Sequence, residues 1–306
     1  MKKFDVVGFG ALNVDKLYNV NKISCEDEEA YITNFKIFCG GSAANTIIGL
    51  SKLGMDTGFI GKISDDHDGN LLLKNLQKEG VDTEGIIVSQ GRSGNVLGFV
   101  DENGQRALYV DPGVNDLIKF NEVKLDYLEN SKVLHLTSFV GDSIKAQENI
   151  INEISEDIII SLDPGRIYAE RGIQYLKNIL NRTDIILINE EELKHLIGHK
   201  YKTCKEGAEV LLKYNIDTVV IKRGDKGSYI TDGSDSHFIE PFDVKCIDTT
   251  GAGDAFNAGF LYGLLNNECI EESGKLGNFV ASCCIQESGA IKGLPELSEL
   301  DTLNKS

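Results

Sequence analysis

The chain has 306 residues, enough for one large α/β domain with a small appendage, and its 31 basic against 48 acidic residues give a formal net charge of −17. That charge repels phosphate backbones and anionic lipid surfaces, so neither nucleic acid nor a membrane is an expected partner. The seven cysteines contain no C-x-x-C pair, which favours free thiols. The sequence shows no signal-peptide core at the start and no apolar run of the roughly 20 residues that a membrane helix needs. Together these features predict a cytoplasmic protein.

Short runs rich in valine and isoleucine alternate along the chain with amphipathic stretches of helical period. This alternation is typical of buried parallel strands linked by crossover helices, and it predicts a doubly wound α/β domain with a mostly parallel sheet flanked by helices. The expected strands cover residues 5–8, 58–63, 132–136, 157–162, 184–188 and 217–222. The expected helices between them cover residues 43–53, 70–79, 143–154, 173–180, 190–197 and 207–213. A hairpin of residues 228–231 and 237–240 follows, and the last expected helices cover 253–265 and 273–284.

Two segments interrupt this alternation, residues 17–38 and residues 95–110, and the second contains the turn Asp101-Glu102-Asn103-Gly104. Each is typical of an antiparallel strand pair inserted into the α/β domain. We expect the two insertions to form a small antiparallel β lid that stands off a single domain of residues 1–306. Two unrelated surface hairpins are the alternative.

The strongest chemical signal is the run Asp248-Thr249-Thr250-Gly251-Ala252-Gly253-Asp254, in which small residues lead directly into an expected helix. Gly251, Ala252 and Gly253 let successive backbone N–H groups point one way at the positive end of the helix dipole, which predicts an anion site. A carboxylate beside a bound phosphate is repelled unless it accepts the proton of an attacking hydroxyl. Asp254 is therefore the candidate catalytic base, and the alternative is an ordinary acid in the first turn of a helix.

Two further runs, Gly8-Phe9-Gly10-Ala11-Leu12-Asn13-Val14-Asp15 and Phe38-Cys39-Gly40-Gly41-Ser42-Ala43-Ala44-Asn45-Thr46, lie upstream. A dinucleotide fingerprint is not favoured in the first run, because Asn13 stands in place of the third glycine. Together the three runs resemble the signatures of the ribokinase (PfkB) family of carbohydrate kinases over essentially the whole chain. The resemblance implies a ribokinase-like fold and the transfer of the γ-phosphoryl group of ATP, with Mg²⁺, to a hydroxyl of a small sugar or polyol.

The same resemblance implies roles for individual residues. The acceptor would be bound by Asn13, Asp15, Gly40, Gly41 and Asn45. Asn189 would approach the ATP phosphates and Glu192 would organise Mg²⁺, largely through water, although three glutamates in a row are equally typical of a plain helix start. The remaining nucleotide contacts would come from Lys222, Gly224, Asp225, Gly227 and Asn278.

The family resemblance leaves potassium and the acceptor open. Asp248 and Thr250 match the positions of a family potassium site near Gly289, but Gly293 stands where the ribokinase pattern carries serine. Ser42 and Thr137 replace a lysine and a glutamate typical of ribokinases, so ribose itself is not favoured.

An unphosphorylated sugar or polyol is the preferred acceptor, and three alternatives remain. A nucleoside could be flanked by Ile37 and Phe99. A phosphosugar would need cations such as Arg92, Arg106 and Arg166. The third alternative is a catalytically silent, sugar-binding regulatory protein. The resemblance also implies a homodimer that forms through the lid.

Overall fold

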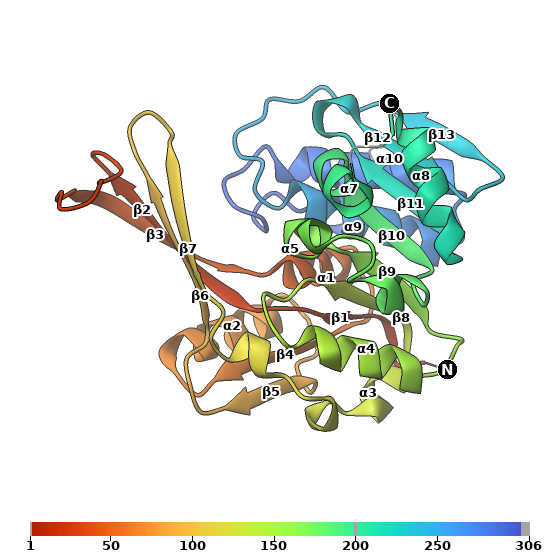
Figure 1. The fold of residues 1–306 in the computed structure, drawn as a ribbon, viewed down its shortest axis with the longest axis horizontal. Coiled ribbons are helices and arrows are strands. Elements are labelled where there is room, and N and C mark those ends of the chain that lie inside the picture. Colours follow the sequence, from red (N-terminus) through yellow and green to blue (C-terminus); the bar gives the residue numbers. More distant parts are fainter. Residues whose placement is uncertain (1, 199–200, 301–306) are drawn as a thin grey trace.

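The main body of the protein is a twisted nine-stranded sheet covered by helices on both faces, and a second, four-stranded sheet projects from one side (Figure 1). The structure is a computed structural model, which describes residues 2–198 and 201–300. In the large sheet the strands follow the order β13-β12-β11-β10-β9-β8-β1-β4-β5. The predicted doubly wound architecture is therefore confirmed.

Seven strands of the large sheet are parallel, and their side chains alternate between two apolar layers. Val6 and Val133 point into one layer, whereas the next residues along each strand, Val7 and Leu134, point into the other. The parallel strands are β1 (Phe4–Phe9), β4 (Thr57–Ser64), β5 (Ile86–Ser89), β8 (Ser131–Thr137), β9 (Ile159–Asp163), β10 (Ile185–Asn189) and β11 (Thr218–Lys222). The antiparallel hairpin of β12 (Ser228–Thr231) and β13 (Ser236–Ile239) completes the sheet.

The helices divide between the two faces of the large sheet. One face carries α1 (Ser42–Lys52), α2 (His67–Lys78), α9 (Ala252–Leu265), α10 (Ile270–Cys284) and the short α11 (Leu297–Leu300). The other carries α3 (Leu125–Glu129), α4 (Ile144–Glu153), α5 (Gly165–Arg171), α6 (Lys177–Leu180), α7 (Glu190–Ile197) and α8 (Cys204–Leu211). Short 3₁₀ turns cover Gly113–Leu117, Phe120–Glu122, Leu212–Tyr214 and Gly224–Lys226. Among the described residues, no helix is long and apolar enough to cross a membrane, and all seven cysteines are free thiols.

Some expected elements differ from the observed ones. The helix expected at 173–180 is reduced to α6, and the helix before it, α5, was not predicted because its seven residues are too few to show a helical period. Strand β5 was also not predicted: it is only four residues long and lies at the edge of the sheet, so its side chains are partly exposed and its apolar signal is weak.

The small sheet consists of β2 (Asn13–Val20), β3 (Ile32–Gly40), β6 (Gly94–Val100) and β7 (Arg106–Asp111) in the order β3-β2-β6-β7. Strands β2 and β3 form one antiparallel pair and β6 and β7 form another, while β2 and β6 join the two pairs in parallel. The two hairpins therefore form one continuous sheet, which we call the lid sheet.

One face of the lid sheet, the cleft face, is turned toward the main body. Asp15 lies on this face, with a carboxylate oxygen 2.5 Å from where a Cβ atom on Gly40 would be, and so does Phe38, whose ring lies against Gly289. Because side chains alternate along a strand, Ile37 and Phe99 point from the opposite, outer face. The hypothesis that these two side chains flank a nucleobase is therefore wrong.

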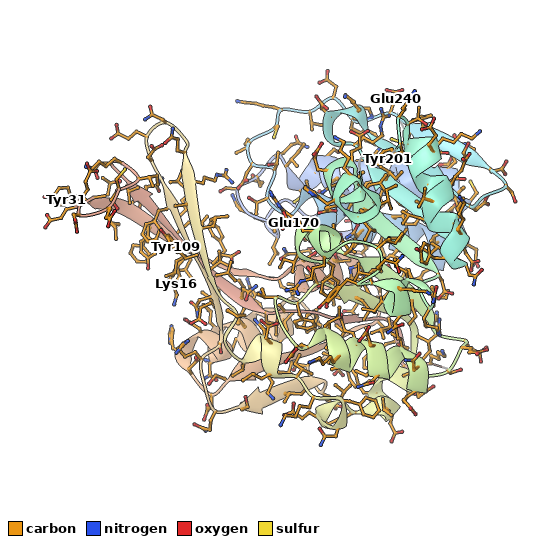
Figure 2. All side chains as sticks on the ribbon, viewed as in Figure 1. Lys16, Tyr31, Tyr109, Glu170, Tyr201 and Glu240 are labelled. Carbon is orange, nitrogen blue, oxygen red and sulfur yellow. The ribbon has the colours of Figure 1, made fainter. Side chains whose placement is uncertain are left out.

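The outer face carries a row of aromatic side chains. Tyr18 lies between Phe35 and Phe99, with ring centroids 6.1 and 5.4 Å away, and Phe99 contacts Tyr109 edge to face at 6.1 Å. Phe35 and Tyr109 remain 58% and 62% exposed. Figure 2 labels Tyr109 and Tyr31 at this end of the molecule. At the base of the sheet this face meets α2, where Lys16 donates to Asp68 at 2.6 Å. Beyond that contact the outer face is an apolar surface without a covering element among the described residues.

Candidate active site

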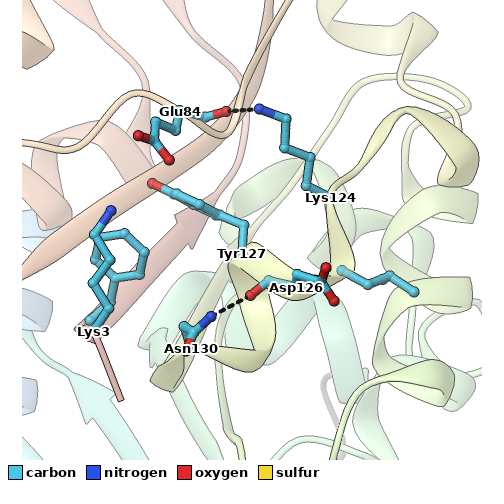
Figure 3. Close-up of a pocket in the computed structure, with 8 residues that line it drawn as sticks. Lys3, Glu84, Lys124, Asp126, Tyr127 and Asn130 are labelled. Carbon is cyan, nitrogen blue, oxygen red and sulfur yellow. Dashed lines mark hydrogen bonds between the residues drawn. The ribbon is translucent and has the colours of Figure 1, made fainter. Parts of the chain in front are cut away.

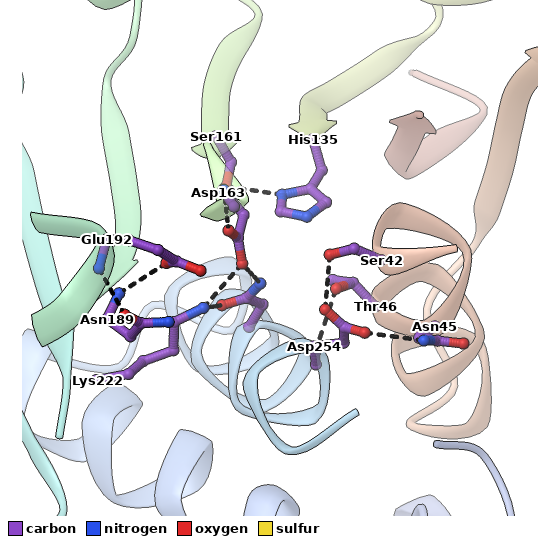
Figure 4. A network of polar contacts seen from close by, with 12 residues as sticks. Ser42, Asn45, Thr46, His135, Ser161, Asp163, Asn189, Glu192, Lys222 and Asp254 are labelled. Atoms are coloured by element: carbon purple, nitrogen blue, oxygen red, sulfur yellow. Dashed lines mark hydrogen bonds and ion pairs between the residues drawn. The ribbon is translucent and has the colours of Figure 1, made fainter. Parts of the chain in front are cut away.

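The predicted site residues gather where parallel strands of the large sheet end and helices α1 and α9 begin (Figure 4). Asp163, Asn189 and Lys222 are the last residues of three neighbouring parallel strands, β9, β10 and β11. Open α/β sheets bind ligands at this edge, because loops and helix N-termini meet there. The topology thus brings together residues that are far apart in the chain.

The turn before α9 is the one predicted to be an anion site. Gly251 adopts φ +77°, and a Cβ atom there would lie 2.3 Å from Cβ of Ala290, so glycine is needed for both reasons. Asp248 braces the turn: its Oδ1 accepts hydrogen bonds from N and Oγ1 of Thr250 at 3.0 and 2.7 Å, and its Oδ2 accepts one from N of Gly289 at 3.0 Å. The first N–H groups of a helix have no partner within it, and of those in α9 the amide of Ala252 donates to the carbonyl oxygen of Thr249 at 3.2 Å.

Asp254 lies in the first turn of α9, and two side chains from α1 hold its carboxylate. The hydroxyl of Ser42 donates to Oδ1 at 2.6 Å, and Nδ2 of Asn45 donates to Oδ2 at 2.8 Å. Burial raises the pKa of Asp254 to about 7, and these two hydrogen bonds oppose that rise. A carboxylate with this pKa exchanges a proton readily near neutral pH.

Helix α1 comes this close to α9 because a glycine faces it: a Cβ atom on Gly49 would lie 2.7 Å from Cβ of Ala258. Gly41, directly before α1, has φ +125°, and a Cβ atom there would lie 2.2 Å from the carbonyl oxygen of Ala11. The other predicted acceptor contacts lie beside it. Oδ1 of Asn13 accepts a hydrogen bond from Nδ2 of Asn115 at 3.0 Å, and burial raises the pKa of Asp15 to about 6. Oδ1 of Asn45 is buried and has no partner among the described residues, which leaves an acceptor atom unsatisfied at the site.

On the nucleotide side, Asn189 and Glu192 form a capping box at the start of α7. Oδ1 of Asn189 accepts a hydrogen bond from N of Glu192 at 2.8 Å, and Oε2 of Glu192 accepts one from N of Asn189 at 3.0 Å. Burial and the charge of Asp163 raise the pKa of Glu192. The charge of Lys222 opposes this rise, and the carboxylate of Glu192 is a hard oxygen ligand of the kind that suits Mg²⁺ held through water.

The remaining predicted nucleotide contacts surround the loop after β11. Gly224 and Gly227 adopt positive φ at either end of a 3₁₀ turn, and Asp225 is exposed between them. Nδ2 of Asn278 donates to the carbonyl oxygens of Ile239 and Glu240 at 3.2 and 2.9 Å, so this side chain holds the chain at the end of β13.

Sequence reasoning missed two residues of the site, Asp163 and Asn257. Nζ of Lys222 donates to Oδ2 of Asp163 at 2.8 Å and to Oδ1 of Asn257 at 3.1 Å, while Nδ2 of Asn257 donates to the same Asp163 oxygen at 2.7 Å. A signal for Asn257 was present in the sequence, because a residue three positions after Asp254 lies on the same helix face. Asp163 could have been found as a polar residue that ends a buried strand.

Two of the three arginines considered as contacts of a phosphosugar form ion pairs on the protein surface. Arg92 pairs with Asp111 at 2.9 Å and Arg166 with Glu170 at 2.6 Å, and both arginine side chains are about three-quarters exposed. Arg106 differs, because its charge acts on Asp248. Burial alone would raise the pKa of Asp248, but the hydrogen bonds that its carboxylate accepts and the charge of Arg106 outweigh burial and lower that pKa. Arg106 therefore lies near the anion-site turn.

A hollow of about 560 Å³ lies elsewhere, around Lys3, Tyr127 and Asn130 (Figure 3). It is next to the N-terminal ends of β1 and β8, at the opposite edge of the sheet from Asp254. The hydroxyl of Tyr127 already donates to Asp82 at 3.0 Å, and Nζ of Lys124 donates to the carbonyl oxygen of Glu84 at 2.9 Å. This hollow is separate from the site at the strand ends. The described residues contain no cluster of three His, Cys, Asp or Glu side chains that could hold a metal ion.

The comparison that decides the family is a match of the model of pfkB family carbohydrate kinases to residues 3–297. The chain belongs to this family. A sugar kinase from Archaeoglobus fulgidus, described as uncharacterized, is 45% identical over 252 residues, which cover 81% of this chain and 98% of that one. An ATP-dependent ribose-1-phosphate kinase from Halopiger xanaduensis is 31% identical over 286 residues, 93% of each chain.

A solved structure gives the same answer for the fold. The crystal structure of a ribokinase from Thermotoga maritima, 26% identical, matches with a TM-score of 0.88 over 99% of this chain and 100% of that one. The predicted family, the ribokinase-like fold and the class of enzyme, a phosphotransferase that acts on a sugar hydroxyl, are therefore confirmed.

Proposed function

We propose that this pfkB family kinase transfers the γ-phosphoryl group of ATP to a hydroxyl of a small sugar or polyol, with Asp254 as the catalytic base. The observation that carries the proposal is the position of Asp254: a carboxylate with a pKa of about 7 stands directly behind a glycine turn whose amides can hold a phosphoryl group. The name of the Halopiger xanaduensis relative supports ATP as the donor.

In the proposed reaction the acceptor hydroxyl oxygen attacks the γ-phosphorus, and the bond from that phosphorus to the bridging oxygen of ADP breaks. ADP leaves with the electron pair, and the hydroxyl proton passes to the carboxylate of Asp254. Amides at Gly251–Gly253 hold the transferring group. Glu192 would hold Mg²⁺ through water, and the bound ion would offset charge on the phosphates.

The acceptor would lie between Asp254 and the cleft face of the lid sheet, in contact with Asn13, Asp15 and Asn45. We propose that the lid sheet acts as a lid, which excludes water from the reaction and so suppresses hydrolysis of ATP. The side chains that position Asp254, Ser42 and Asn45, sit at the start of α1. Closing the acceptor against this helix would align its hydroxyl with the base.

A phosphorylated sugar is the second candidate acceptor. Arg106 is a cation near the anion-site turn, and a relative that covers 93% of this chain is named a ribose-1-phosphate kinase. The nucleoside alternative has lost the two side chains that were expected to flank its base, because both lie on the outer face of the lid sheet.

We also propose a homodimer that forms through the outer face of the lid sheet. The exposed aromatic and aliphatic side chains there, Phe35, Ile37 and Tyr109 among them, would lose contact with water in such a dimer. A hollow of about 370 Å³ next to them is lined by Val20, Ile32, Phe99 and Tyr109. Phe35→Glu should convert a dimer to a monomer in light scattering, and a wild-type protein that is monomeric at high concentration contradicts the proposal.

Activation by potassium and a cytoplasmic location stay predictions. For potassium, both oxygens of Asp248 already accept hydrogen bonds from Thr250 and Gly289, so a bound ion would have to share them. Turnover measured in potassium and in sodium at equal ionic strength tests this point.

The experiment that tests the function is an ADP-release assay with ATP and Mg²⁺ against pentoses, hexoses, polyols, nucleosides and sugar phosphates. Turnover that depends on one class of acceptor, and that Asp254→Asn abolishes, is the expected result. Asp157→Asn, an exposed substitution on the surface, is the matched control and should retain full activity. Silence across the panel from folded protein that binds ATP would favour the sugar-binding regulatory alternative.

A further inference from the structure

We propose that Lys222 is a further catalytic residue whose ammonium group contacts the phosphoryl group during transfer, and that Asp163 and Asn257 are the residues that position it. The inference rests on the proposed kinase reaction and adds a cation to it. The reaction itself is unchanged, since the proton still passes to Asp254 and ADP is still the leaving group.

The ammonium group is held in a closed triangle of side chains (Figure 4). Oδ2 of Asp163 accepts hydrogen bonds from both Lys222 and Asn257, and Oδ1 of Asn257 accepts one from Lys222. The other oxygen of Asp163 accepts a hydrogen bond from N of Gly165 at 3.0 Å. Both ends of the Asn257 amide and both oxygens of Asp163 are thus engaged, so the position of Nζ is defined.

The position of Nζ is directly beside the anion site. A Cβ atom on Gly253 would lie 3.4 Å from Nζ of Lys222, and Gly253 belongs to the turn that leads into Asp254. An ammonium group has three N–H donors. Two of them are used by Asp163 and Asn257, and the third has no partner in the part of the chain that the structure describes. That donor is available to a bound phosphoryl oxygen.

The electrostatics also favour an anion between Lys222 and α9. The N-terminus of α9 carries a partial positive charge, so an anion that lies between it and the ammonium group of Lys222 is attracted by both. The charged neighbours of Lys222 are Asp163, Glu192 and Asp254, which outweigh the effect of burial and raise the pKa of Lys222. Lys222 therefore stays protonated and able to donate.

A purely structural ion pair is the competing explanation. Lys222 and Asp163 have side chains that are only 11% and 7% exposed, and a buried pair of this kind adds little stability beyond what apolar side chains would give. His135, a further ionisable group beside the pair, is kept neutral: burial lowers its pKa to about 4, and its Nδ1 lies 3.0 Å from Oγ of Ser161. The pair is therefore costly to bury, and its place beside the anion site accounts for it.

The test compares Lys222→Met with the double variant Lys222→Met/Asp163→Asn, in which no charge is left buried alone. Turnover of the wild-type enzyme is measured first, because its absence would refute the kinase reaction rather than the role of Lys222. If Lys222 contacts the phosphoryl group, both variants should lose about 10²-fold or more in kcat, with little change in the acceptor KM. Recovery of the double variant to within a few-fold of wild type would make the pair structural and overturn the proposal.

Two further readouts separate a contact in the reaction from a structural role. Asn257→Leu should lower kcat by about tenfold, less than Lys222→Met, because it removes only a positioning contact.

Lys222 lowers the pKa of Asp254 and Asp163 raises it. The acid limb of kcat/KM against pH should therefore move to higher pH in Lys222→Met and to lower pH in Asp163→Asn. Limbs that do not move in either variant contradict the proposed arrangement. Should Lys222→Met fail to fold, the double variant alone decides the question.

Discussion

Replacing Asp254 by asparagine should stabilise the free protein while it removes the activity. The carboxylate is held near the N-terminus of a helix but in a site that favours its neutral form, so its pKa rises from the ordinary 3.8 to about 7. Asparagine has nearly the same shape and carries no charge. The variant thus removes the cost of burying an ionised group and leaves the packing of α1 against α9 intact.

The size and the pH dependence of this effect follow from proton linkage. A group whose pKa is raised by folding contributes stability below its unfolded pKa, and that contribution is lost as the pH rises through the folded pKa. For Asp254 the window runs from about pH 4 to pH 7, and the full loss is at most about 4 kcal/mol. Partial exposure of the side chain reduces this figure. The amide cannot accept from both Ser42 and Asn45, which costs about 1 kcal/mol at every pH.

Urea unfolding of both proteins at pH 5 and pH 8 measures the difference. The free energy of unfolding of Asp254→Asn, relative to wild type, should be higher at pH 8 than at pH 5 by about 2 kcal/mol. Asp157→Asn, the surface control, should show no such change. A stability difference between Asp254→Asn and wild type that is the same at both pH values would refute the raised pKa, and with it the argument that Asp254 is tuned as a base near neutral pH.

Three further substitutions test the site. Ser42→Ala removes a hydrogen bond that lowers the pKa of Asp254, so the acid limb of kcat/KM against pH should move to higher pH; an unmoved limb contradicts the contact. Asp15→Asn should raise KM for the acceptor by about tenfold or more and leave KM for ATP unchanged, and steady-state kinetics with the reverse pattern would place Asp15 elsewhere. Gly251→Ala places a Cβ atom at φ +77° and against Ala290. The free energy of unfolding, measured by thermal unfolding, should fall by about 1–3 kcal/mol, and the assay should show that most of the activity is lost. A stable, active variant would rule out the strained turn.

Several of the predicted site residues have a local signal in the sequence. Gly251 and Gly253 could be placed at a helix start from their neighbours alone, because a small-residue turn before an amphipathic run has few other structures. Asp254 followed from them by its position. Asn189 and Glu192 likewise have a local signal, since an Asn with a Glu three residues later is a capping box whatever else it does. Their roles toward a ligand remain predictions.

Which face of a strand meets the rest of the protein could not be predicted from neighbouring residues. Ile37 and Phe99 were expected over the substrate, but the lid sheet turns them outward with Tyr18 and Phe35. A shift of one residue exchanges the two faces of a strand, and both faces of this sheet are apolar, so the sequence pattern contains no information on which face meets the main body. Contacts with the main body, such as that of Phe38 with Gly289, determine it.

The sequence by itself determined the family, the alternation of strands and helices, the anion-site turn and the candidate base, because each of these depends on neighbouring residues along the chain. Only the tertiary structure decided which side chains meet across elements. Asp163, Lys222 and Asn257 stand 35 to 94 positions apart, and they form one triangle because two parallel strands end beside the first turns of the same helix. Long-range contacts of this kind depend on the order of strands in the sheet, which no local pattern records.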